Sequence, residues 1–430
     1  MMQVANNSYL AGLLEGRPFA DRGDALNRLR AGAVERVGVL SLPSTRDEDW
    51  RFTDLAPLTK MCFQPYRGVP AIVESDIARY SIAESAQRLV FVDGVYAPQL
   101  SSPLNGGIVV SSLAAALPAH AAAIVADLGR RALFDNNAFT ALNTAFLNDG
   151  ALVLLPRNAV LDTPVHLLFV ATRKEAAAHP RCLVLAGAGS RATVIEEYVA
   201  LTEDAYLTNA VGEFVLADDA QLTHVRVQRE SRQAFHIGHS AVALAHGSRY
   251  HGIHAGFGAR LSRFNLDVVQ NAEGAECEIG GLAIIDGSQL ADTHSSIDHA
   301  RAHGVSRQQH KCIVGGSARA VFNGRIVVRQ GAQLTNSAQS SRNLLLSERA
   351  RVDTKPQLEI FADDVKCAHG ATVGQLDADE VFYLKSRGLS ESVARSLLTY
   401  AFGAEILHAI PVASLRDRLE KMLLAQTERA

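Results

Sequence analysis

The sequence is poor in aromatic residues, in cysteine and in net charge. Aromatic side chains make up 6% of its 430 residues, with a single tryptophan. Its five cysteines form no Cys-x-x-Cys pair, which argues against a zinc ribbon or a disulfide framework. The 42 basic and 45 acidic residues leave a net charge of −3, without a basic stripe. This balance excludes the usual electrostatic signature of a nucleic-acid-binding protein.

Long hydrophobic runs are also missing. No segment approaches the ~20 apolar residues that a helix needs to cross a membrane. The first residues, MMQVANNSYLAGLLEGRPFADRGD, have neither the apolar core nor the positive start of a signal peptide. We therefore expect a cytoplasmic protein that binds neither membranes nor nucleic acids.

The sequence contains instead many short, repeated segments that are rich in aliphatic residues. Hydrophobic residues make up 48% of the chain, so its core must consist of Val, Ile, Leu and Ala. A turn of small residues that leads into a short strand recurs through the middle of the chain, at about 30-residue intervals or about half of that. These turns begin at Gly189, Asp219, Gly247, Gly274, Gly287, Gly316, Gly331 and Arg349.

This repeat predicts a mainly β protein whose core is a β-helix. Stacked coils of short strands pair every backbone group with the neighbouring coil and leave an aliphatic ladder inside. A compact β-sandwich is the alternative architecture. The polar–apolar alternation continues without a helical interruption, which favours the β-helix.

Helical patterns flank this core. We expect an N-terminal helical domain over residues 1–90, a β-helix core with its entry segment over 91–374, and a C-terminal helical domain over 375–430. In the N-terminal part, Trp50 and Phe52 in RDEDWRFTDL are predicted to anchor a loop onto the neighbouring domain.

Three helices are predicted in the C-terminal domain. Asp377, Ser390 and Ser414 stand where N-caps belong, and Gly388 ends the first helix. The second helix carries an apolar stripe. Packing against the other C-terminal helices is the simplest explanation of this stripe.

The stretch DDVKCAHGATVG contains the strongest candidate pair of metal ligands in the sequence, Cys367 and His369. In a strand, residues i and i+2 point to the same face about 6.5 Å apart, so these two side chains should project together. Thiolate and imidazole both suit iron and iron–sulfur clusters. The alternative is that Cys367 fills the core and His369 is a hydrogen-bonded turn residue.

Other histidines look less like ligands. His236 and His239 are three residues apart, as are His251 and His254, and strand residues at this spacing face opposite sides. The stretch DTHSSIDHARAH holds a further group of acidic and histidine side chains, which we expect to be a solvated loop. Its members are Asp292, His294, Asp298, His299 and His303.

The remaining cysteines and the glycines carry no chemistry in this interpretation. Cys182, Cys277 and Cys312 lie in strand patterns and should be buried and inert. No Gly-rich segment fits a GxxxxGK[ST] phosphate loop, so any ATP hydrolysis must belong to a partner.

Several of these stretches resemble a known family. RDEDWRFTDL, the β-helical middle, DTKPQLEIFADDVKCAHGATVG and YLKSRGLSESVARSLLTYAFGAEIL resemble the SufB/SufD family of the SUF iron–sulfur cluster assembly system, from about residue 40 to about residue 410. The KCAHGATVG segment and the chain length resemble the SufD branch.

The resemblance implies a right-handed parallel β-helix with helical domains at both ends. It also implies a scaffold subunit without catalytic turnover of its own. Such a subunit pairs with its SufB paralogue through the β-helix and binds the SufC ATPase through its C-terminal helices. The resemblance does not decide whether the chain forms a homodimer in the absence of SufB.

The resemblance also assigns roles to residues. His369, and less directly Cys367, would contact metal where a nascent iron–sulfur cluster forms at the interface with SufB, and a second chain would supply the other ligands. We expect no cofactor tightly bound by the chain alone, and no flavin motif is present. For SufC, the predicted contacts are Arg395, Leu398, Phe402 and Glu405.

A carbohydrate-active β-helix enzyme, a lyase or a hydrolase, is the alternative function. Glu196 with Glu197, or Asp353 with Lys355, would then supply its acid–base groups. The scarcity of aromatic residues, which sugar-binding clefts use for stacking, weighs against this alternative.

Overall fold

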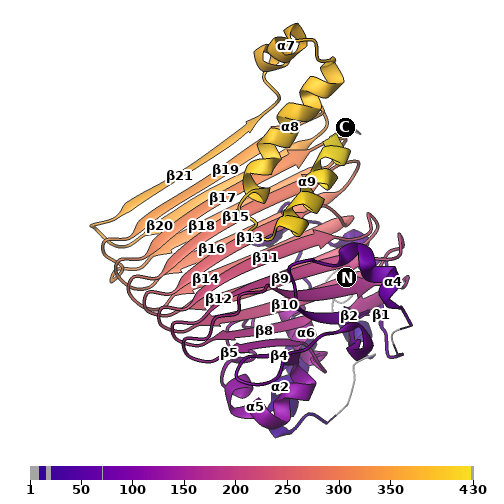
Figure 1. Ribbon diagram of the computed structural model, residues 1–430, viewed down its shortest axis with the longest axis vertical. Coiled ribbons are helices and arrows are strands. Elements are labelled where there is room, and N and C mark those ends of the chain that lie inside the picture. Colours follow the sequence, from indigo (N-terminus) through magenta and orange to yellow (C-terminus); the bar gives the residue numbers. More distant parts are fainter. Residues whose placement is uncertain (1–8, 16–20, 70, 428–430) are drawn as a thin grey trace.

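The structure is a computed structural model that describes residues 9–15, 21–69 and 71–427. Its body is a solenoid of about eight turns, built from two long sheets whose strands run parallel in successive coils (Figure 1). We name each sheet by the last strand in it, as the β20 sheet and the β21 sheet.

Even-numbered strands dominate the β20 sheet. It contains β1 (Gln64–Pro65), β4 (Val109–Ser112), β5 (Ala151–Leu155), β7 (Ala176–Ala178), β8 (Arg181–Ala186), β10 (Leu207–Leu216), β12 (Phe235–Leu244), β14 (Leu261–Gln270), β16 (Leu290–His299), β18 (Arg319–Val328) and β20 (Arg351–Ile360). The β21 sheet contains β2 (Gln87–Val92), β3 (Val95–Tyr96), β6 (Val165–Ala171), β9 (Arg191–Ala200), β11 (Gln221–Arg229), β13 (Arg249–Gly256), β15 (Glu276–Ile285), β17 (Val305–Val314), β19 (Asn336–Leu345) and β21 (Lys366–Gly374).

Each coil contributes one strand to each sheet. Equivalent residues of neighbouring coils are therefore close in space, as with Arg263 and Asp292, 29 residues apart, and Ser306 and Ser337, 31 residues apart. Alternate residues of each strand point inward and form the aliphatic core, which includes Val194, Leu222, Leu266, Ile297 and Ile326. The structure thus confirms the predicted β-helix and rules out the sandwich.

The first coils are covered by N-terminal elements. These are α2 (Asp24–Val39), η1 (Glu48–Trp50), α3 (Ala56–Thr59), α4 (Glu74–Ile77), η2 (Ala78–Tyr80), η3 (Pro98–Leu100), α5 (Leu113–Asp127) and α6 (Ala138–Ala145). Trp50 stacks on Phe139 of α6 and lies under Arg263 of β14, so the predicted anchor is confirmed. Helix α5 was not predicted from the sequence.

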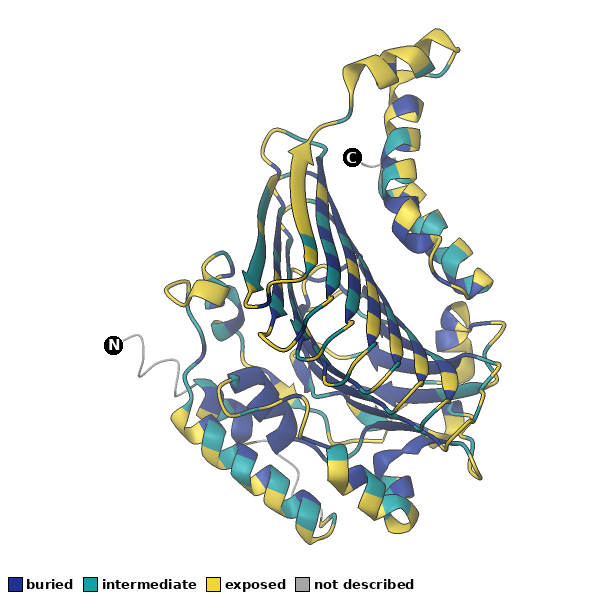
Figure 2. Cartoon of the chain, turned by 90° about the vertical axis from the view of Figure 1, so that its left-hand side faces the viewer, coloured by how far each residue is buried: buried dark blue, intermediate teal, exposed yellow. Residues whose placement is uncertain are grey.

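Three helices follow the last strand. They are α7 (Ala378–Ser386), α8 (Glu391–Leu407) and α9 (Ala413–Thr427), and α8 and α9 run along the outer face of the β21 sheet while α7 projects beyond it (Figures 1 and 2). Asp377 and Ser390 cap α7 and α8 as predicted. Ser414 does not cap α9, because it lies inside that helix. Its backbone and side chain donate to Glu84, an N-terminal residue.

No helix in the described part of the chain is long and apolar enough to cross a membrane.

Candidate functional site

The last coil of the solenoid is uncovered. Strands β20 and β21 each pair with one neighbour only, β18 and β19, so each presents a free edge among the described residues. Neither strand contains a fully buried residue, whereas at least half of the residues of β18 and of β19 are buried (Figure 2). Ile360, Phe361 and Val373 are exposed apolar residues at this end. A long, exposed and partly apolar sheet edge is a surface onto which another strand can add.

Cys367 and His369 lie on β21, in this last coil. They pair with Ser337 and Gln339 of β19, both of which are buried, so the two side chains share the inward-facing side of the strand. Cys367 is half-buried and packs against the solenoid core, while His369 is exposed. The prediction that the two residues project to one face is confirmed. Of the alternative, the turn assignment of His369 is wrong, because His369 lies in a strand, whereas Cys367 does pack against the core.

This pair alone does not make a closed metal site. Among the described residues, no group of three or more His, Cys, Asp or Glu side chains converges closely enough to hold a metal ion. Burial raises the pKa of the Cys367 thiol, although a hydrogen bond with the Ser337 backbone opposes this. The thiol is therefore mostly protonated until a metal or a nearby cation displaces its proton.

Two of the predicted partner-binding residues on α8 contact the solenoid, although Glu405 also remains exposed to solvent. The Lys311 ammonium on β17 pairs with the Glu405 carboxylate, and it also donates to the Phe402 carbonyl oxygen at 2.8 Å. The same ammonium lies 4.6 Å from the centre of the Phe402 ring. Phe402 and Glu405 therefore hold α8 on the β21 sheet. Arg395 is exposed and Leu398 is half-buried.

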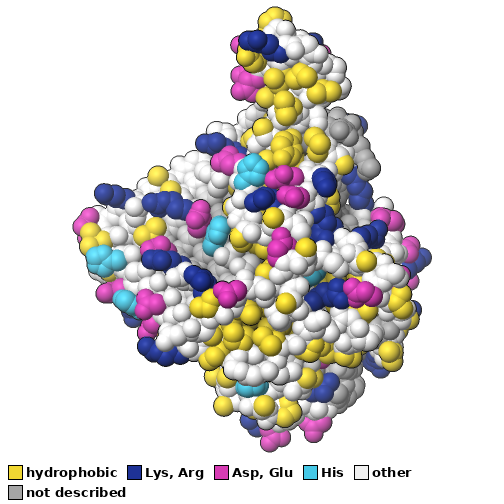
Figure 3. All heavy atoms as spheres, viewed as in Figure 1, with side chains coloured by type: hydrophobic (Ala, Val, Ile, Leu, Met, Phe, Trp, Pro, Cys, Tyr) yellow, Lys and Arg dark blue, Asp and Glu magenta, His cyan; other side chains and the backbone are white. Residues whose placement is uncertain are grey.

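Other exposed apolar side chains of the C-terminal helices are Leu424 of α9 and a set on α7 and α8. The members of this set are Phe382, Tyr383, Val393 and Leu397, and Phe382 has 71% of its surface exposed. Figure 3 shows hydrophobic side chains gathered on these helices at the top of the view. Sequence reasoning missed this set, which we call the helical patch. The bulky apolar residues of α7, Phe382 and Tyr383, were the signal available in the sequence.

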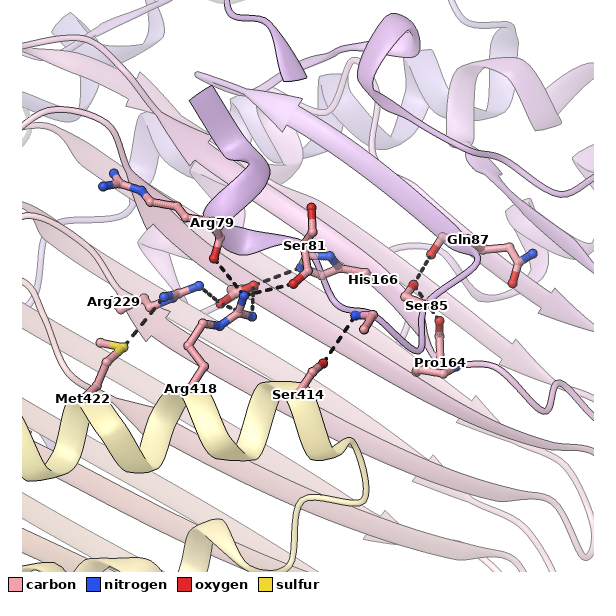
Figure 4. A network of polar contacts seen from close by, with 12 residues as sticks. Arg79, Ser81, Ser85, Gln87, Pro164, His166, Arg229, Ser414, Arg418 and Met422 are labelled. Atoms are coloured by element: carbon pink, nitrogen blue, oxygen red, sulfur yellow. Dashed lines mark hydrogen bonds and ion pairs between the residues drawn. The ribbon is translucent and has the colours of Figure 1, made fainter. Parts of the chain in front are cut away.

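A buried carboxylate ties α9 to the first coils (Figure 4). Glu197 of β9 is fully buried, and His166 of β6 lies 3.0 Å from its carboxylate. Arg229 of β11 and Arg418 of α9 pair with the same carboxylate. Burial alone would raise the pKa of Glu197, but these partners outweigh it and hold the pKa at about 2. Helix α9 is thereby fixed to the first coils of the solenoid.

The two His-x-x-His pairs are split between the faces of their strands, as predicted. His236 lies inside the solenoid, 2.6 Å from Glu230, whereas His239 lies outside, 2.9 Å from Asp267. His254 is buried inside, and its neighbour His251 belongs to the outer face of β13.

The predicted solvated loop around Asp292 is wrong. Asp292, His294, Asp298 and His299 belong to β16, and His303 lies in the turn after it. Asp292 is fully buried between Arg263 and Thr53, because the N-terminal segment covers the outer face of this sheet. His299 points into the solenoid, where its Nε2 lies 2.9 Å from Ser306.

The residues proposed for the carbohydrate enzyme do not assemble into an acid–base pair. Glu196 bonds His224 inside the solenoid while Glu197 bonds Arg418 outside it. Asp353 pairs with Arg319, and Lys355 pairs with Glu48. Cys182, Cys277 and Cys312 are buried as predicted, and burial raises the pKa of Cys277 and of Cys312 to about 12.

Fold and site together define a β-solenoid protein with an uncovered last coil and three C-terminal helices, α7–α9. Comparisons with known proteins match a single family over nearly the whole chain. A family described as the SufBD core domain of SUF system FeS cluster assembly matches residues 169–402, and one described as the SufBD protein N-terminal region matches residues 19–167.

Individual relatives point the same way. The chain is 42% identical to an iron–sulfur cluster assembly SufBD family protein of Synechocystis, over 93% of this chain and 90% of that one. It is 32% identical to the iron–sulfur cluster assembly protein SufD of Escherichia coli, over 88% of each chain. Identity to the Bacillus subtilis protein of the same name is 26%, over 93% of each. The chain belongs to the SufB/SufD family of SUF iron–sulfur cluster assembly proteins, and the Escherichia coli and Bacillus subtilis relatives carry the name SufD.

Proposed function

We propose that this chain is a SufD-type scaffold subunit. It would form an interface with a SufB-type sister subunit, and the iron–sulfur cluster would be assembled at this interface. The observation that carries this proposal is the uncovered last coil, with Cys367 and His369 on its inward-facing side. A sister solenoid that adds strands to β20 and β21 would cover the exposed Phe361 and Val373 and bring its own ligands to the pair.

A shared interface agrees with the chemistry of the pair. One thiolate and one imidazole cannot enclose an iron–sulfur cluster, which usually takes four ligands. The cluster would be assembled at this interface between the two subunits and then transferred to another protein. A second copy of this chain is the alternative occupant of the edge when the sister subunit is absent.

The C-terminal helices are the proposed docking element for a SufC-type ATPase. The helical patch supplies the apolar anchors, and Arg395 lies on the same helix as two of them. Phe402 and Glu405 would then support docking indirectly, because they hold α8 on the solenoid. Cluster assembly powered by that ATPase would require no catalytic turnover by this chain. Localisation in the cytoplasm stays a prediction.

Co-expression tests both contacts. The full chain is produced with SufB-type and SufC-type proteins of one organism, and the purified complex is reconstituted with iron and sulfide under anaerobic conditions. We expect a stable complex that develops the visible absorption of an iron–sulfur cluster. A chain that purifies alone under these conditions would contradict the proposal.

A further inference from the structure

Polar side chains stack on one another inside the last coils of the solenoid. Ser306 of β17 and Ser337 of β19 are paired in the sheet, and their hydroxyl oxygens are 2.7 Å apart. Gln308 and Gln339 are the next inward-facing pair of the same two strands, and Gln339 Nε2 donates to Gln308 Oε1 at 2.8 Å. Paired inward positions of neighbouring coils therefore form hydrogen bonds in this region. In the last coil, the residue paired with Gln339 is His369.

The Gln339 side chain is buried, and one end of its amide is fixed. Only 3% of the residue is exposed. Its Nε2 is taken by Gln308, whose own Nε2 donates to Ser295 Oγ at 2.8 Å. A Cβ atom at Gly324, on strand β18 of the other sheet, would lie 2.4 Å from Gln339 Nε2. The glycine thus leaves free the space that this amide occupies.

The other end of the amide lacks a partner. Within the described part of the chain, Gln339 Oε1 is buried and accepts no hydrogen bond. A buried carbonyl oxygen without a donor is costly, and native proteins rarely leave one. Gln308 already occupies the preceding coil, so the neighbour that remains is His369 in the following one. Neighbouring strands lie about 4.7–4.9 Å apart, which places the His369 ring within reach of Gln339.

His369 carries the donor that this oxygen needs. An imidazole binds a metal through the lone pair of one ring nitrogen, and its other nitrogen commonly donates a hydrogen bond to a nearby oxygen. Such a hydrogen bond selects the tautomer and orients the ring. Gln339 lies at the paired edge of β21, whereas the opposite edge of β21 is the free one.

We propose that Gln339 is a positioning residue for His369. The ring, which is exposed in the structure, turns toward β19 and donates the hydrogen of one ring nitrogen to Gln339 Oε1. The lone pair of the other nitrogen is then directed toward the free edge, where a metal ion would approach. Use of this lone pair in cluster assembly rests on the proposed function. The hydrogen bond itself does not, because it needs only the last two strands of the β21 sheet.

The test is nitrogen NMR spectroscopy of the isolated full chain, labelled with ¹⁵N-histidine. The His369 signals are assigned by their loss in His369→Gln, and the shifts of the two ring nitrogens report which one carries the hydrogen. At about pH 8.5, where an exposed imidazole is neutral, one tautomer should predominate in the wild type. Gln339→Met removes the acceptor and should change the ratio of the tautomers by about threefold or more. An unchanged ratio would overturn the proposal.

Two further variants separate positioning from a general effect on the fold. Ser341→Ala removes another buried polar group from the inward side of β19, but Ser341 is paired with Ala371, so the His369 tautomers should not change. Gln339→Glu keeps an acceptor of the same length and strengthens it by its charge, so the predominant tautomer should become more populated. This variant also serves if Gln339→Met does not fold. Mixed tautomers in Gln339→Glu, or equal effects of Ser341→Ala and Gln339→Met, would refute the positioning role.

Reconstitution with the sister subunit distinguishes this proposal from the proposed function. Gln339→Met should slow cluster formation in the complex by about tenfold or more, as is typical when the residue that orients a metal-binding histidine is lost. Cluster formation at the wild-type rate would remove Gln339 from the site. A wild-type chain that forms no cluster would instead contradict the proposed function, and the tautomer ratio would still decide whether the hydrogen bond exists.

Discussion

Arg418 Nη2 lies 3.4 Å from Glu197 Oε2, although 221 residues separate them in the sequence. The contact joins the last helix of the chain to an early coil of the solenoid. The same guanidinium donates to the carbonyl oxygens of Arg79 and Ser81 (Figure 4). Helix α9 is therefore held by buried polar contacts as well as by its apolar face.

Replacing Arg418 should loosen α9 selectively. We expect Arg418→Met to cost about 1–2 kcal/mol of local stability, less than the loss of a fully buried partner, because Glu197 keeps His166 and Arg229. Amide exchange in α9, followed by mass spectrometry, should then accelerate roughly tenfold. The control is Arg416→Met, whose side chain is more exposed and lies 3.9 Å from Asp417. Equal effects of the two substitutions would argue against the Glu197 contact as the cause.

Glu197 should also make the protein sensitive to acid. Its folded pKa is about 2, below the value of 4.5 expected without these contacts. The group therefore stabilises the fold fully above about pH 4.5, and this stabilisation is lost as the pH falls towards 2. Glu197→Gln should lower stability at pH 7 and flatten its decline between pH 4.5 and 2, as measured by thermal unfolding. A variant that keeps the wild-type pH dependence would refute this assignment.

His369→Ala should separate assembly from folding. The side chain is exposed, so the thermal midpoint should change little, by about 0.5 kcal/mol or less in stability. Cluster formation in the reconstituted complex, read from visible absorption, should be lost. Thr372→Ala, on the opposite side of the same strand, serves as the control. Full cluster formation by the His369 variant would remove this residue from the site.

A charge at the open end should weaken pairing with the sister subunit. Phe361 is 63% exposed in the isolated chain, so Phe361→Asp should leave the monomer stable. At the centre of an interface the same change should weaken affinity by about 30-fold or more, measured by titration calorimetry. Val39→Asp places the same charge on an equally exposed apolar site of α2, and it should bind normally.

If the helical patch binds the ATPase, a substitution within it should weaken that contact alone. Leu397→Asp should abolish co-purification of the SufC-type protein while pairing with the sister subunit persists, because a charge would have to be buried in an apolar contact. Glu405→Gln should retain the ATPase, since that residue already pairs with Lys311. Retention by the Leu397 variant together with loss in the Glu405 variant would restore the docking face predicted from the sequence.

Local patterns in the sequence determined the solenoid and the direction of many side chains. The spacing of small-residue turns predicted the coils, since each coil repeats the same strand and corner. The period of two along a strand predicted that Cys367 and His369 point together and that His251 and His254 do not. Helix α5 escaped prediction because Pro118 interrupts an Ala-rich pattern that has little amphipathic contrast.

Only the tertiary structure decided which surfaces remain free. It showed that β21 is the uncovered last strand, that Phe402 and Glu405 face the solenoid, and that the region around Asp292 lies buried under the N-terminal segment. It also revealed polar side chains of successive coils in contact inside the solenoid, such as Gln308 and Gln339. The sequence encodes the period of each element, but exposure depends on which distant element covers it, and that is settled only when the elements pack.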